Sequence, residues 1–139
     1  MKISDFYDEN DEIKSVLSQG FISLWRGWLT REEAYKLNQV DAYEVERFKQ
    51  LIRLLYSKYD IYRAEWDSRT LHKINNIDSF LSDYPCSFEG GDFVEIFIPS
   101  LDLLIKETYD YTFIFWYKEN KVQECISSLA SQVRLYTFN

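Results

Sequence analysis

Few residues in this chain belong to types that carry out covalent or metal chemistry. The 139 residues include a single histidine, His72, and two cysteines, Cys86 and Cys125. A structural zinc ion needs four such ligands, and the two cysteines do not form a CxxC pair. The chain contains neither a phosphate-binding glycine loop nor a nucleophile elbow. We therefore expect a protein that is not an enzyme and that needs no metal or other cofactor.

Carboxylates are the only abundant side chains in this sequence that could take part in acid–base catalysis or metal binding. Glu95 and Asp102 fall in neighbouring stretches with strand patterns, so they could meet as the carboxylate pair of a glycosidase or a metal-dependent nuclease. A nuclease must attract a polyanion, and the formal net charge of −7 opposes this. The same charge disfavours nucleic-acid binding. The sequence leaves a carboxylate-based activity open, but the net negative charge favours binding of a basic partner.

Aromatic residues concentrate in the stretch TYDYTFIFWYKE (108–119). Alternate residues of a strand share one face, so this stretch predicts an aromatic ladder on one face and Trp116 on the other. The ladder consists of Tyr109, Tyr111, Phe113, Phe115 and Tyr117. Because the middle of the stretch is apolar on both sides, we expect a central strand whose Phe113, Ile114 and Phe115 lie in the core.

Two capping boxes, Thr30 with Glu33 and Asp41 with Glu44, mark the starts of helices. The apolar residues after Asp41 recur at three- and four-residue steps, as on the buried face of an amphipathic helix. With weaker patterns elsewhere, these signals predict helices at 4–19, 30–38, 40–59, 67–85 and 120–134. The carboxylates near the N-terminus are either a solvated helix start or an acidic docking patch. These carboxylates are Asp5, Asp8, Glu9, Asp11 and Glu12.

Strand patterns follow Gly90-Gly91, at 93–98, 101–107 and 111–117. Their short links predict an antiparallel meander, because a parallel crossover needs a longer connection. A short helix over 100–108 is the alternative for the middle segment. The segments 21–30 and 60–66 are each either a strand or a linker, and 135–139 is a candidate last strand.

Helical patterns occupy the first part of the chain and strand patterns the second, which is typical of the α+β class. We expect N-terminal helices packed on a small antiparallel β-meander, followed by a C-terminal helix. Few glycines and prolines occur and no linker divides the chain, so 1–139 is expected to form a single domain. Its helical part would span about 1–85, and the meander with the C-terminal helix about 86–139.

The N-terminus MKISDFYDENDEI lacks the basic and apolar regions of a signal peptide, and no apolar run is long enough to span a membrane. We therefore expect a cytoplasmic protein that does not contact membranes. A reducing cytosol disfavours a disulfide, so Cys86 and Cys125 are expected to be free thiols.

Carboxylates and aromatic residues are interleaved between 89 and 110, where Lys106 is the only cation. Such a surface suits a basic protein partner, since carboxylates steer the partner and rings anchor it. We expect this site on a sheet face that helices do not cover. Its carboxylates would be Glu95, Asp102, Glu107 and Asp110, and its anchors Tyr109, Tyr111 and Trp116.

The expected function is therefore binding of a basic protein. In general character, and not by any motif, the chain is similar to bacterial immunity proteins and antitoxins, which occlude the basic active site of a toxin or nuclease. Two alternatives stay open. One is a structural or adaptor subunit, including a homodimer, and the other is a small-molecule-binding domain whose aromatic ladder lines a pocket.

Overall fold

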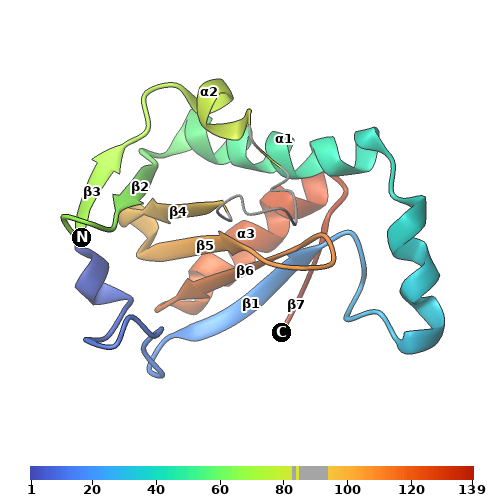
Figure 1. Ribbon diagram of the computed structural model, residues 1–139, viewed down its shortest axis with the longest axis horizontal. Helices are drawn as coiled ribbons and strands as arrows, with labels where there is room; N and C mark the ends of the chain where they lie inside the picture. The colour runs from blue at the N-terminus through green and yellow to red at the C-terminus, as the bar shows by residue number, and fades with distance from the viewer. Residues whose placement is uncertain (83, 85–93) are drawn as a thin grey trace.

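The computed structural model describes residues 1–82, 84 and 94–139, and it confirms an α+β fold (Figure 1). The strands are β1 (Ser18–Ser23), β2 (Tyr62–Glu65), β3 (Thr70–Lys73), β4 (Glu95–Ile98), β5 (Leu103–Glu107), β6 (Thr112–Tyr117) and β7 (Tyr136–Phe138). The α-helices are α1 (Ala42–Lys58), α2 (Ile77–Leu81) and α3 (Asn120–Gln132). The 3-10 helices are η1 (Ile3–Asp5), η2 (Arg31–Gln39) and η3 (Pro99–Leu101).

The strands form one seven-stranded sheet in the order β3-β2-β4-β5-β6-β1-β7. Every pairing is antiparallel. The predicted meander is confirmed as β4-β5-β6, whose register places Ile96 opposite Ile105 and Ile105 opposite Phe115. As predicted, β6 is central, because β5 and β1 pair with its two edges.

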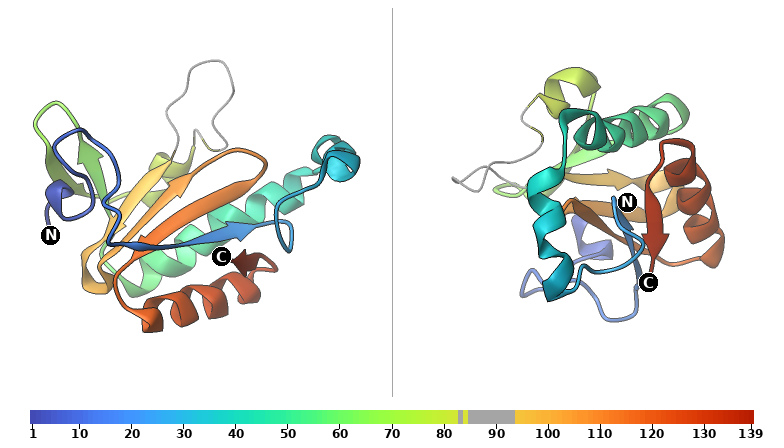
Figure 2. Two further views of the ribbon diagram at one scale, coloured as in Figure 1. Left: turned by 90° about the horizontal axis from the view of Figure 1, so that it is seen from below. Right: turned by 90° about the vertical axis from the view of Figure 1, so that its right-hand side faces the viewer.

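Helices α1 and α3 cover one face of the sheet (Figure 2). The start of α1 is set by Asp41, whose side chain accepts a hydrogen bond from the Glu44 backbone N–H at 2.8 Å. Both helices turn an apolar stripe towards the strands, as the periodicity predicts. The fully buried side chains of this layer include Phe48, Leu51, Ile126, Ile105 and Phe115.

The N-terminal segment, residues 1–17, covers part of the opposite face. This segment contains only one short 3-10 helix, η1, and otherwise follows an irregular path. Five of its apolar side chains pack on that face, four of them buried and Ile13 partly buried, where they meet residues of β4, β5 and β6. The buried residues of this second cluster are Ile3, Phe6, Tyr7, Leu17, Phe97, Leu104 and Trp116.

Gly20 lets β1 lie close beside a large ring of β6. The two residues are paired across the strands, and a Cβ atom at position 20 would lie 2.5 Å from Cζ of Phe115. The missing side chain therefore makes room for Phe115 in the helix-covered core. This close approach is a reason for a glycine inside a strand, where glycine is otherwise unfavourable.

Several expectations about local structure are wrong. The segment 4–19 is not a helix, because its carboxylates form a turn in which Asp8 Oδ1 accepts hydrogen bonds from the backbone N–H groups of Asn10 and Glu12, at 2.8 and 3.1 Å. Within 67–85, the structure has the strand β3 and the short helix α2. The strands β1, β2 and β3 show that helices and strands are not segregated along the chain.

The sheet shows that the segments expected to be either strands or linkers contain strands. The segments 21–30, 60–66 and 135–139 contribute to β1, β2 and β7, respectively. The alternative of a helix over 100–108 is wrong, since β5 fills most of that range. Cys86, Pro85 and the Gly90-Gly91 turn lie outside the described residues, and Cys125 is a free thiol.

Candidate protein-binding surface

The carboxylates chosen from the sequence do not come together on one open face. Glu107 is only 7% exposed, on the helix-covered face, and its Oε1 accepts a hydrogen bond from the Val94 backbone N–H at 3.0 Å. Asp102 and Asp110 precede and follow β5, so they lie towards opposite ends of that strand. Both have left-handed backbone angles, with φ of 46° and 60°. Their positions are those of turn residues, and the expectation of a joint electrostatic group is wrong.

Glu95 does lie on the face opposite the helices, but its side chain is only 11% exposed. Tyr7 Oη donates a short hydrogen bond to Glu95 Oε2, and Trp66 Nε1–H donates to Oε1 at 3.1 Å. Lys106 Nζ lies 4.0 Å from Glu95 Oε2. Both carboxylate oxygens are therefore engaged within the chain, and Glu95 ties the N-terminal segment to the sheet.

The expected aromatic anchors are placed unequally. Trp116 is buried under the N-terminal segment. Tyr109 and Tyr111 precede β6, so the expected ladder is limited to Phe113, Phe115 and Tyr117. Tyr111 has a φ of 53° and packs against the helix-covered core, whereas Tyr109 is exposed. Among the three chosen anchors, only Tyr109 is exposed.

The structure instead presents Trp66 beside the N-terminal segment. Trp66 follows β2 in the hairpin to β3, and the Arg69 backbone N–H donates to its carbonyl at 3.3 Å. The Trp66 ring meets Tyr7 edge-on, with ring centroids 4.9 Å apart. The Arg69 guanidinium lies 5.7 Å from the Trp66 ring centroid and forms an ion pair with Asp11. These contacts fix the indole, yet 38% of Trp66 stays exposed.

Tyr7 holds this arrangement as a proton donor. Burial raises the pKa of its phenol, and the hydrogen bond to Glu95 and the charge of that carboxylate raise the pKa further. The phenol therefore keeps its proton at neutral pH and donates it towards Glu95. The neighbouring indole N–H is then free to use the other oxygen of the same carboxylate.

The acidic turn of the N-terminal segment lies beside the β2–β3 hairpin, and the Asp11–Arg69 ion pair joins the two (Figure 2). We define the acidic Trp66 surface as Trp66 with the carboxylates of the acidic turn and of the hairpin, Asp8, Glu9, Asp11, Glu12 and Asp67. Asp11 pairs with Arg69. The other four carboxylates have no ion pair among the described residues. Lys14 is a further cation of the same segment.

Two features of the sequence indicate this surface, but the strand patterns do not relate them to each other. The acidic run 8–12 suggests a docking patch, and Trp66 stands between Glu65 and Asp67. Only the tertiary structure brings the two segments together, since they are far apart in the chain.

A second exposed region surrounds η2, which extends away from the sheet (Figure 1). Glu33 accepts a hydrogen bond from the Thr30 backbone N–H at 3.2 Å, so the predicted cap is present. No residue of η2 is buried. Exposed rings lie in and beside this segment, namely Trp28, Tyr35 and Tyr43.

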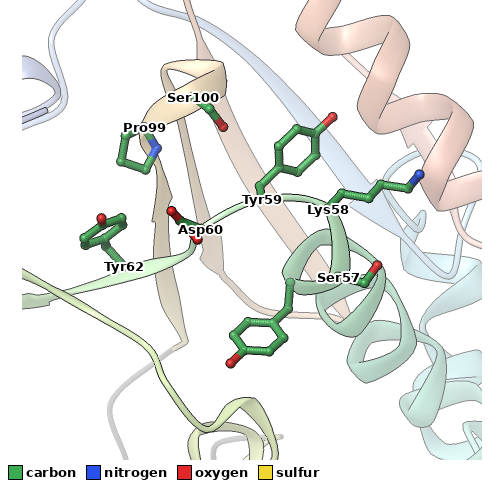
Figure 3. A pocket seen from close by; sticks show the side chains of 8 residues that line it. Ser57, Lys58, Tyr59, Asp60, Tyr62, Pro99 and Ser100 are labelled. Carbon is green, nitrogen blue, oxygen red and sulfur yellow. The ribbon is translucent and has the colours of Figure 1, made fainter.

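A hollow of about 500 Å³ lies where α1 leads into β2 (Figure 3). We call it the α1 hollow. Its tyrosines already have partners: Tyr56 Oη donates to the Asn75 carbonyl at 2.9 Å, and Tyr59 Oη lies 3.6 Å from Cys125 Sγ. Asp60, also in its lining, pairs with Lys73 at 3.2 Å. Three of the polar side chains in its lining are therefore already engaged within the chain.

Within the described part of the chain, no three or more His, Cys, Asp or Glu side chains gather in a way that could hold a metal ion. None of the described helices combines the length and the apolar character needed to cross a membrane. Comparisons with protein families, curated proteins and solved structures find no match to this chain. The candidate site therefore depends on geometry and charge alone.

Proposed function

We propose that this chain is an acidic, cytosolic, stoichiometric inhibitor that binds a basic protein through the acidic Trp66 surface. The proposal belongs to the type of bacterial immunity proteins and antitoxins, with a toxin or nuclease domain as the partner. The observation that carries it is an exposed tryptophan, held by Tyr7 and Glu95, beside an acidic turn whose Asp8, Glu9 and Glu12 form no ion pair within the described part of the chain.

Each part of this surface has a role in the proposed complex. Carboxylates with unpaired charge steer a cationic partner and speed its association. Trp66 enters the contact as a large ring that loses little conformational freedom, because Tyr7 and Glu95 already fix it. The acidic groups would take positions that substrate phosphates occupy in a nuclease cleft, and the bound chain would block that cleft.

The test begins with identification of the partner by affinity capture and mass spectrometry, followed by stopped-flow measurements on the purified pair. We expect one-to-one binding, loss of the partner's activity at that ratio, and an association rate that falls as salt rises. The double variant Glu9→Lys with Asp67→Lys should associate about tenfold more slowly or worse. Trp66→Ala should mainly speed dissociation.

A matched control separates this surface from the net charge. Glu32→Lys with Glu124→Lys reverses two exposed carboxylates elsewhere and changes the net charge by the same amount. This control should associate at nearly the wild-type rate. Equal slowing of both double variants, or a partner that retains its activity when bound, contradicts the proposal.

A structural or adaptor role is the second candidate, and the η2 region favours it. A 3-10 helix of nine residues with no buried side chain lacks the tertiary support that such long runs usually need. If η2 joins two copies, light scattering should show a mass that rises with concentration, and Tyr35→Ser should abolish that rise. A constant monomer mass excludes the homodimer.

A further inference from the structure

A second hollow lies between the N-terminal segment and the β2–β3 hairpin, on the side of the sheet away from the helices. We call it the N-terminal hollow. Its volume is about 570 Å³, which falls within the range of about 300–1,000 Å³ typical of small-molecule sites. Apolar and aromatic side chains form part of its wall, among them Ile3, Leu71 and Tyr62. Ile3 is buried, while Leu71 and Tyr62 keep part of their surface exposed.

The charges around the N-terminal hollow are opposite to the charge of the whole protein. Lys2 and Arg69 line it, and no carboxylate does so among the described residues. Lys2 has no ion pair within the described part of the chain. Arg69 is shared with Asp11, which lies outside the lining. A net positive, partly apolar hollow in a protein of net charge −7 is an unusual local reversal.

The α1 hollow differs from the N-terminal hollow in the charges of its lining. Its lining combines Lys58 with Asp60 and lies at the C-terminal end of α1, where the helix dipole is negative. The two hollows share Tyr62 and Pro99, so they adjoin, but only the N-terminal hollow offers cations without a carboxylate.

We propose that the N-terminal hollow binds a small organic anion, a carboxylate or phosphate attached to an apolar or aromatic body. The anionic group would lie against Lys2 and Arg69, and the apolar body against Ile3, Leu71 and Tyr62. Thr70 also lines the hollow, but its hydroxyl is engaged by Ser68 Oγ at 2.7 Å and His72 Nε2 at 3.0 Å. Long polyanions are repelled by the acidic remainder of the molecule, so the ligand must be small.

The experiment uses two fluorescent probes of similar shape, the anion 8-anilinonaphthalene-1-sulfonate and the neutral N-phenyl-1-naphthylamine. Titration of the full chain with the sulfonate should show one saturable site. The neutral probe should bind at least about fivefold more weakly, the effect expected of one partly solvated charge interaction. Equal binding of both probes, or no saturation by the sulfonate, overturns the proposal.

Matched variants locate the site. Ser4 also lines the hollow and is exposed. Ser4→Glu and Ser4→Gln differ mainly in one negative charge at the hollow, so the sulfonate should bind Ser4→Glu about fivefold more weakly than Ser4→Gln. Lys2→Gln should weaken binding, Lys2→Arg should restore it, and Lys58→Gln in the α1 hollow should leave it unchanged. Equal affinities of the two Ser4 variants, or a loss in Lys58→Gln, overturn the assignment. The proposed protein partner is not needed here, so either proposal can fail alone.

Discussion

The two faces of the sheet are covered by different kinds of structure. On one face, α1 and α3 bring apolar stripes to the strands and form the larger core. On the other, the irregular N-terminal segment brings a few apolar side chains and, at its margin, the contacts of Tyr7, Glu95 and Trp66. A helix satisfies its own backbone groups and can therefore cover a sheet with apolar residues alone.

An irregular segment must find other partners for its backbone groups. Here Asp8 accepts hydrogen bonds from the backbone of Asn10 and Glu12, and the Lys14 backbone N–H donates to the Phe6 carbonyl at 2.9 Å. The polar residues that stabilise this cover also stand at its rim and face solvent. The acidic Trp66 surface follows directly from covering a sheet without a helix.

The largest expected effect comes from removing a buried ring from one of the two covers of the sheet, the helices or the N-terminal segment. Phe48→Ala should lower the free energy of unfolding by about 3–5 kcal/mol, since it leaves a cavity beneath α1. Phe6→Ala removes an equally buried ring, but the N-terminal segment can detach without unfolding the helical core, so the loss should be smaller. Urea unfolding followed by circular dichroism measures both. Equal losses would mean that the two covers unfold as one cooperative unit.

A smaller effect is expected from Glu95→Gln. The new amide offers one acceptor oxygen to two donors, Tyr7 Oη and Trp66 Nε1–H, so one donor must face the amide NH₂. The free energy of unfolding should fall by about 1–3 kcal/mol, and Trp66 fluorescence should change. Glu124→Gln, at an exposed position on α3, is the control. A loss no larger than in that control would show that Glu95 does not hold the segment.

The smallest effect is a dependence on alkaline pH. Because burial and Glu95 raise the pKa of Tyr7 above the ordinary tyrosine value of about 10, the folded state keeps this proton where the unfolded state loses it. The contribution is complete below pH 10 and falls as pH rises further, by up to about 1.4 kcal/mol at one unit above. Lys106, Glu95 and Asp11 are the charged groups around Tyr7.

Urea unfolding at pH 8 and pH 11 measures this dependence. Tyr7→Phe should reduce the difference in unfolding free energy between the two pH values. Tyr43→Phe is the matched control, since Tyr43 is 86% exposed and should titrate alike in both states. A wild-type slope retained in Tyr7→Phe would assign the alkaline effect to other tyrosines.

The helices that start with strong local signals were predictable from the sequence. Asp41 with Glu44 acts within one turn and needs no tertiary information. The strand β3 was missed because Leu71, Ile74 and Ile77 are spaced at three residues, a pattern that also fits a helix face. Pairing of β3 with β2 outweighs the local preference for a helix, and this pairing is a tertiary effect.

The candidate site was less predictable than the fold. Of the residues chosen for the expected surface, only Glu95 contacts Trp66, and it does so as an engaged, mostly buried carboxylate. Asp102 and Asp110 have left-handed backbone angles in turns, a role that short polar side chains fill well. Alternation along a strand reveals which residues share a face, and it does not reveal what covers that face.

The position of β1 bears on how the chain reaches its native state. Residues 18–23 lie between β6 and β7, which come much later in the chain. During synthesis, β1 therefore cannot pair with either neighbour until those later strands have been made. With pairings so distant in sequence, we expect folding in milliseconds to seconds, not microseconds.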